Sequence, residues 1–138
     1  RVIRALRTLD AISVENSAYP GTPDVNCTEG WIELKKILSW PVKKGIVQLP
    51  HFTPQQRVWL QRRWVRGGGA WLLLQVGRSW LLFDGLTAGK LVGHLNQEQL
   101  IKRALRVWGK GLKDDELIEA LNSTKPKING KIKHDCST

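Results

Sequence analysis

The chain has 138 residues, of which 41% are hydrophobic and 25% charged, and a formal net charge of +10. This length fits one domain, and the composition is that of a globular protein rather than a disordered one. The excess of Lys and Arg predicts attraction to polyanions, nucleic acid first and anionic membrane second. The longest apolar runs are far shorter than the roughly 20 residues of a membrane-spanning helix, which excludes a transmembrane class.

The two cysteines, Cys27 and Cys136, are far apart and lack metal-ligand spacing. They indicate neither a disulfide framework nor a zinc site, so we expect a reducing, cytoplasmic compartment. The N-terminus does not resemble a signal peptide. Because the chain begins with Arg1 and contains no methionine, we expect the initiating residue to lie outside it.

The first element expected is an amphipathic helix over 2–14, where apolar residues recur at steps of three and four. It should end near Asn16, because the stretch 17–23 is dense in turn formers and holds two prolines. The runs 24–27 and 30–37 then predict two strands joined as a hairpin.

Side chains alternate along the second of these strands. Ile32 and Leu34 should point to one face, and Trp31, Glu33 and Lys35 to the other. A carboxylate and an ammonium group therefore share one face of the strand.

After a loop over 38–53, Thr53 as N-cap and proline at the first position predict a helix over 54–65. Three glycines at 67–69 end this helix. The Leu-, Val- and Trp-rich runs that follow, 70–76 and 79–83, predict a pair of largely buried strands.

Near the C-terminus, Asn96 and Gln99 form a capping-box pattern that opens a helix with apolar residues at helical spacing over 100–108. A last short helix is expected over 114–121, with acids in its first turn. The order α-β-β-α-β-β-α-α supports a mixed α/β fold. We therefore expect one domain over 1–121, comprising a core at 10–84 and C-terminal helices at 96–121. A flexible basic tail should follow over 122–138.

One cluster of residues contains carboxylates that could bind a metal ion, together with a lysine. If the two strands pair, Asp24 comes within reach of Glu33 and Lys35, which lie about 6.5 to 7 Å apart on one face. Two converging carboxylates make a hard-oxygen site suited to Mg²⁺ or Mn²⁺, and an adjacent lysine can stabilise charge on a phosphodiester. Taken alone, Glu33 and Lys35 are better explained as a solvated strand face, because polar residues point outward along an alternating strand.

Three motifs occur in order: Pro-Gly-Thr-Pro-Asp-Val at 20–25, Gly-Trp-Ile-Glu-Leu-Lys at 30–35, and Phe-Thr-Pro-Gln-Gln at 52–56. Together they resemble the PD-(D/E)XK nuclease superfamily, most closely its small VRR-NUC and phage-type members. The similarity covers about residues 10–84. It implies a restriction-endonuclease-like core, in which a mixed β-sheet is flanked by helices.

The resemblance also implies roles for individual residues. Glu15, expected at the end of the first helix, matches an acid that members of this kind often add, although it is also compatible with simple solvent exposure. The implied catalytic set is Asp24, Glu33, Lys35, Glu15 and Gln56. The implied ligands for Mg²⁺, which Mn²⁺ would replace, are Asp24, Glu33, the main-chain carbonyl of Leu34, and Glu15.

Basic residues flank this cluster, and such residues bind the DNA backbone without reading sequence. The alternative for the helical arginines is a solvated face, although no acid lies in that helix to pair with them. The candidate DNA-binding residues are Lys36, Lys43, Lys44, Arg57, Arg62, Arg63, Arg66 and, for base stacking, Trp40. The remaining tryptophans in periodic elements are expected in the core: Trp59, Trp64, Trp71, Trp80 and Trp108.

The function expected is that of a Mg²⁺-dependent DNA endonuclease selective for DNA structure, such as a Holliday-junction resolvase or a nicking enzyme. It would act on branched or double-stranded DNA in the cytoplasm of a prokaryote or a phage-infected host. Symmetric cutting favours a homodimer, with 80–83 and 100–108 as candidate interfaces. Two alternatives stay open: a non-catalytic DNA-binding or scaffolding domain, and a sequence-specific restriction or homing-type nuclease.

Overall fold

The computed structural model describes residues 1–15 and 20–126 and shows a mixed α/β fold built on one six-stranded sheet. The strands follow sequence order across the sheet, and only β3 and β4 run parallel. The strands are β1 (Ile12–Ser13), β2 (Val25–Cys27), β3 (Gly30–Ile37), β4 (Ala70–Val76), β5 (Ser79–Asp84) and β6 (Arg106–Trp108). The α-helices of the described residues are α1 (Val2–Ala5), α2 (Pro54–Val65), α3 (Gly85–Leu91), α4 (Gln97–Arg103) and α5 (Asp114–Thr124).

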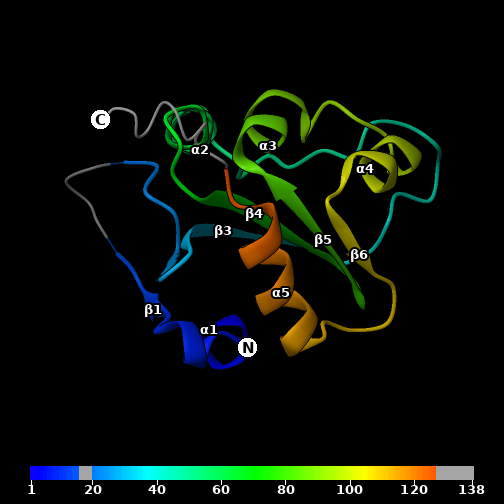
Figure 1. Ribbon diagram of the computed structural model, residues 1–138. Coiled ribbons are helices and arrows are strands. Elements are labelled where there is room, and N and C mark those ends of the chain that lie inside the picture. Colours follow the sequence, from blue (N-terminus) through cyan, green and yellow to red (C-terminus); the bar gives the residue numbers. More distant parts are fainter. Residues whose placement is uncertain (16–19, 127–138) are drawn as a thin grey trace.

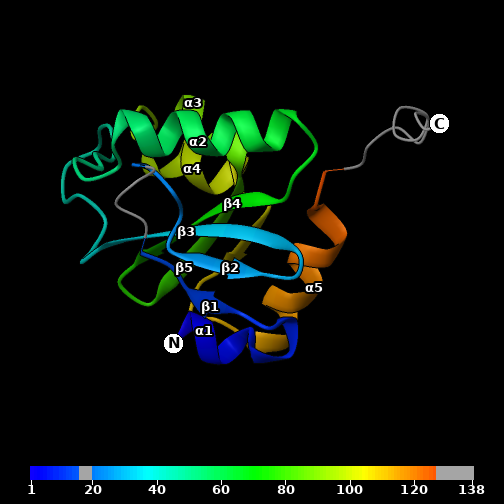
Figure 2. The same cartoon turned by 90° about the vertical axis from the view of Figure 1, so that its left-hand side faces the viewer.

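The helices cover both faces of the sheet. Helices α2, α3 and α4 form the layer above it in Figure 1, and α1 and α5 lie below; Figure 2 shows the same two layers from the side. The central strand β4 explains this arrangement, because its side chains are buried on both faces. Leu72 and Leu74 pack into the α2 layer, whereas Trp71 and Leu73 pack into the α5 layer. A continuous apolar run is typical of a strand covered on both sides.

Several predicted elements are confirmed. The second hairpin strand, the helix 54–65 and the strand 70–76 have the expected bounds, and β5 is one residue longer than expected. Both predicted helix starts carry full capping boxes, Thr53 with Gln56 and Asn96 with Gln99. These features are set by local sequence, which is why a single sequence sufficed to find them.

The predicted helix over 2–14 is wrong. Only α1 and a short 3₁₀ turn at Arg7–Leu9 form, and Asp10 then adopts a left-handed conformation with φ of 55°. The chain continues as β1, which pairs antiparallel with β2. Without β1 the outer edge of β2 would be unpaired, and strand pairing here outweighs the helical spacing of the apolar residues.

The predicted helix over 100–108 is wrong in its second half. The helix α4 ends at Arg103, Ala104 is extended, and the chain becomes β6 along the edge of β5. The amide of Leu105 donates to the carbonyl oxygen of Leu82 at 2.7 Å. This pairing satisfies the main chain at the edge of β5, which a continued helix would not do. The helix α3, which begins with Asp84 as N-cap, had no counterpart among the expected elements.

The C-terminal helix α5 extends three residues beyond its predicted end, so the tail predicted over 122–138 begins later than expected. Residues 127–138 of that tail, like residues 16–19 of the predicted turn, lie outside the described residues. Arg1 joins the N-terminus to α5 through an ion pair with Asp114 at 2.6 Å. In the described ranges, no helix is long and apolar enough to cross a membrane.

The tryptophans expected in the core pack as predicted, to different depths. Trp71 and Trp108 are buried. The other three, Trp59, Trp64 and Trp80, are partly buried and pack against the two core clusters. The strand 80–83 is wrong as a candidate interface, because Leu81, Leu82 and Phe83 are completely buried inside the molecule.

Candidate active site

The candidate site lies where β2 diverges from β3. The paired register of the two strands ends at Val25 and Ile32, and the next outward-facing amide of β3, that of Leu34, donates to Oδ2 of Asp24 at 2.9 Å. Beyond the paired region, the Asp24 side chain therefore takes the place of the β2 main chain as the hydrogen-bond acceptor for β3. Because the N–H and C=O of one residue point to the same edge of a strand, the Leu34 carbonyl faces this edge too.

Glu33 occupies an unusual position. It is 1% exposed and is the single buried charged residue of the described chain. As the alternation predicts, Glu33 shares a face of β3 with Trp31. This face lies under α2, since the Trp31 ring meets the Trp59 ring of α2 edge-on at 5.4 Å. Its atom Oε1 is buried with no hydrogen-bond partner. An unpartnered buried carboxyl oxygen costs free energy, and a proton shared with Asp24, a bound ion or a catalytic role would account for it.

Lys35 lies against Glu33 on the same face. Its Nζ is 3.3 Å from Oε2 of Glu33 and donates to the main-chain oxygen of His51 at 2.9 Å, while the side chain is 14% exposed. The second contact ties β3 to the segment that leads into α2. An ammonium group has three donors, and these two contacts leave the third for a substrate or a water molecule.

Burial, followed by the negative charge of Asp24, raises the pKa of Glu33 from 4.5 to about 8, and the charge of Lys35 opposes this rise. Two carboxyl groups brought together in a buried site disfavour each other's ionised form. The positive charge of Lys35 therefore does not compensate for the burial of Glu33 and the negative charge of Asp24.

The donor set fits a divalent cation. Asp24, Glu33 and the Leu34 carbonyl are hard oxygen ligands, the Oε1 atom of Glu33 lacks a partner, and a bound cation would supply the missing positive charge. The third acid, Glu15, is placed differently. It is exposed in the segment after β1, and the described residues contain no group of three or more His, Cys, Asp or Glu side chains suited to a metal.

Gln56 has a structural role at the start of α2. Its Oε1 accepts from the Thr53 amide at 2.9 Å, and its own amide donates to Oγ1 of Thr53 at 3.2 Å. Gly21 packs against the same helix start, where a Cβ would lie 2.5 Å from the carbonyl oxygen of Gln55. The motif at 52–56 thus caps α2 and seats the turn that precedes Asp24.

The basic residues expected to bind DNA fall into two groups. Arg57 is partly buried and donates to the carbonyl oxygens of Phe52, Gly89 and Val92, with its guanidinium 4.3 Å from the Phe52 ring centre. Burial lowers its pKa. The other helical arginines are exposed on α2, where Arg63 stacks on the Trp59 ring at 4.6 Å. The exposed members are Lys36, Lys43, Lys44, Arg62, Arg63 and Arg66.

Two features of the site were not apparent from the sequence. The His51 carbonyl and the Leu34 amide hold Lys35 and Asp24 in place, and main-chain groups leave no residue-type signal. The depth of Glu33 was missed because the alternation of β3 did not reveal that α2 covers its polar face.

Comparison of the sequence with models of known protein families finds no match, and comparison with curated proteins finds none either. What this chain does must therefore be inferred from its own site.

Proposed function

We propose that this chain is a divalent-metal-dependent endonuclease that hydrolyses phosphodiester bonds in DNA, with selectivity for branched or nicked structures. The observation that carries the proposal is the buried carboxylate of Glu33, which has an unpartnered oxygen and lies between Asp24 and Lys35. The order of the motifs around these residues, with its resemblance to the PD-(D/E)XK superfamily, supports the same function. In this proposal the mixed sheet corresponds to a restriction-endonuclease-like core.

In this proposal, Asp24, Glu33 and the Leu34 carbonyl hold Mg²⁺ or Mn²⁺. The bound ion would lower the pKa of a water molecule and neutralise charge on the phosphodiester. Lys35 presents its remaining N–H to a phosphate oxygen or the attacking water, and its contact with the His51 carbonyl fixes its position.

The charge distribution supports a nucleic-acid substrate. Between Glu33 and Asp84 the sequence contains nine Lys and Arg and no Asp or Glu. This segment includes the end of β3, the loop 38–53 and α2, and Lys35 of the site contacts the His51 carbonyl in that loop. Contacts from such residues to phosphates supply affinity that is independent of base sequence. We propose in addition a homodimer for cutting two strands, and a reducing, cytoplasmic location in which the buried Cys27 stays a thiol.

A second candidate is a DNA-binding domain without catalysis. It is favoured by one observation: only two acidic side chains converge at the site, because the exposed Glu15 does not join them within the described chain. Such a protein would keep the basic surface and bind DNA without cleaving it.

Cleavage assays on branched, nicked, linear and supercoiled DNA in Mg²⁺, Mn²⁺ or EDTA separate the two candidates. We expect metal-dependent cleavage that Glu33→Ala and Lys35→Ala each abolish. The matched control Glu119→Gln, which removes an exposed carboxylate on α5, should cleave as the wild type does. Absence of cleavage, or cleavage that survives both active-site substitutions, would refute the nuclease.

A further inference from the structure

The loop 38–50 protrudes from the end of β3, directly after the residues of the candidate site. Its apolar residues are divided between core and solvent. Val47 and Leu49 are buried, whereas Val42 is fully exposed and Leu38 is 84% exposed. Groups of exposed apolar side chains bordered by polar residues are typical of interaction sites.

Residues on both sides of the exposed segment 41–45, the tip of the loop, contact the rest of the protein. On one side, Trp40 packs against the core cluster under α2. On the other, Ile46 forms a bridge with Asn96, and the amide of Val47 donates to the carbonyl oxygen of Leu95 at 2.8 Å. The exposed segment 41–45 is therefore flanked on both sides by residues that contact the body of the protein.

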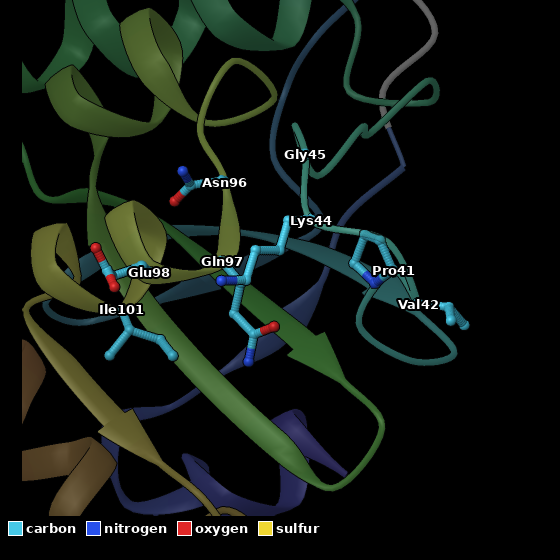
Figure 3. A pocket seen from close by; sticks show the side chains of 8 residues that line it. All are labelled: Pro41, Val42, Lys44, Gly45, Asn96, Gln97, Glu98 and Ile101. Atoms are coloured by element: carbon cyan, nitrogen blue, oxygen red, sulfur yellow. The ribbon is translucent and has the colours of Figure 1, made fainter.

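A groove with a volume of about 610 Å³ separates this tip from the start of α4. Figure 3 shows Val42 at the outer end of the loop with its side chain turned away from α4, and Lys44 extending towards Gln97 across the groove. Pro41 lies beside Val42. The tip is thus an apolar dipeptide bordered by cations.

The charge of the loop selects the kind of partner. Lys43 and Lys44 are exposed at the tip, Lys36 is exposed near the end of β3, and no acid occurs from Lys36 to Thr53. The one acid at the groove is Glu98 of α4. Apolar side chains flanked by cations are suited to DNA whose bases are unstacked, because the cations bind phosphates while the apolar group enters the base stack.

We propose that the loop 38–45 is a wedge that inserts Pro41 and Val42 at the branch point of a DNA junction, with Leu38 packing against the displaced bases and Lys43 and Lys44 holding the flanking phosphates. This inference rests on the proposed function and names its substrate as branched DNA. The branch is the favoured occupant because its bases are already partly unstacked, which reduces the cost of insertion. The loop also continues β3, the strand that carries Glu33 and Lys35.

The test is a binding experiment in EDTA, which does not depend on cleavage. The probes are a synthetic four-way junction and a linear duplex of the same length and composition, each with 2-aminopurine at its centre. We expect the wild type to bind the junction at least tenfold more tightly and to raise its 2-aminopurine fluorescence. The double variant Leu38→Ser/Val42→Ser should lose this preference to within twofold and lose the fluorescence rise, while its affinity for the duplex stays unchanged.

Two controls sharpen the result. Ile12→Ser removes an exposed apolar side chain from β1, at the far edge of the sheet, and should behave as the wild type. Lys43→Gln/Lys44→Gln should weaken binding to both probes alike and reduce the slope of log affinity against log salt by about 2.

A double variant that keeps the junction preference would overturn the wedge. The wedge is equally refuted if Leu38→Ser/Val42→Ser converts a wild-type dimer into a monomer in sedimentation, or abolishes binding to anionic phospholipid vesicles, because the tip would then serve a second copy or a membrane. If the wild type cleaves junctions and the variant Leu38→Ser/Val42→Ser still prefers the junction over the duplex, the wedge is refuted but the nuclease is not. A tip-dependent preference without any cleavage in Mg²⁺ or Mn²⁺ would support the wedge and refute the nuclease.

Discussion

Oδ2 of Asp24 accepts a hydrogen bond of 2.9 Å from the amide of Leu34, so the carboxylate that we propose as a metal ligand also closes the edge of β3. One side chain thus has a structural role through one oxygen and an electrostatic role through its charge. The two roles can be separated by substitution, because an amide oxygen accepts hydrogen bonds without carrying the charge.

We expect Asp24→Asn to keep the contact with Leu34 and to unfold within about 0.5 kcal/mol of the wild type, while metal-dependent cleavage is lost. Asp24→Ala should lose cleavage too and be about 1 to 2 kcal/mol less stable, because the Leu34 amide loses its acceptor. Urea unfolding and cleavage assays on the two variants provide the measurement. Equal stability of Asn and Ala variants would contradict the structural role.

The second prediction concerns pH and the metal-free protein. Glu33 binds its proton more tightly in the folded state, with a pKa of about 8, than in the unfolded state, where the value is about 4.5. A raised carboxyl pKa stabilises the fold below the unfolded value, and this contribution is lost as pH rises through the folded value. The free energy of unfolding should therefore decline between about pH 4.5 and 8, by on the order of a few kcal/mol at about 1.4 kcal/mol per pKa unit.

The variant Glu33→Gln should remove most of this decline, because it has no proton to lose. The exposed Glu119→Gln should leave the decline intact. Mg²⁺ or Mn²⁺ should raise the melting temperature of the wild type at pH 8, and should raise it less at pH 5, where the proton competes with the cation. A wild type whose stability rises from pH 5 to 8 in EDTA would show that Glu33 is already ionised in the fold.

How far the sequence predicts this fold depends on whether the deciding interactions are local. The alternation in β3 and the capping box of Thr53 and Gln56 involve residues within a few positions of one another, and both were predictable. The strands β1 and β6 exist because β2 and β5 would otherwise have unpaired edges. Their partners are distant in sequence, so the helical spacing around Ile12 and Trp108 was misleading.

The candidate site shows the same division. That Asp24, Glu33 and Lys35 would meet followed from a hairpin between neighbouring strands, which is a short-range inference. That Glu33 would be buried did not follow, because its cover comes from α2 and the loop before it. The partners of Arg57 in α3 and after it were equally invisible, so this arginine looked the same as its exposed neighbours.

The third prediction separates Lys35 from its neighbour Lys36. Lys35→Met should reduce cleavage by at least about 100-fold, because it removes the cation that faces Glu33 and any bound phosphate. It should also raise the pKa of Glu33, since the charge of Lys35 lowers it. Lys36→Met removes an exposed cation from the same strand and should cleave at close to the wild-type rate, with somewhat weaker DNA binding. Equal loss of cleavage in the two variants would assign Lys35 to DNA binding only.

The fourth prediction concerns Arg57, whose guanidinium donates to three carbonyl oxygens including that of Val92 at 2.5 Å. Arg57→Gln should lower the free energy of unfolding by about 2 to 3 kcal/mol, because buried acceptors lose a charged donor. At a temperature where the variant is folded, its DNA affinity should fall less than that of Arg62→Gln. Arg62→Gln, on the exposed side of α2, should leave stability unchanged within about 0.5 kcal/mol. The opposite pattern would place Arg57 in the DNA interface.

The last prediction concerns Gln56, which the resemblance implied as a catalytic residue and whose side chain accepts a hydrogen bond from the Thr53 amide. Gln56→Glu retains an oxygen for the Thr53 amide and should be as stable as the wild type, whereas Gln56→Ala should lose about 1 kcal/mol with the capping box. Because the contacts of Gln56 with Thr53 are those of a helix cap, cleavage by Gln56→Ala should fall only in proportion to the unfolded fraction. A fully folded Gln56→Glu that fails to cleave would instead show that the side chain acts on the substrate or the metal.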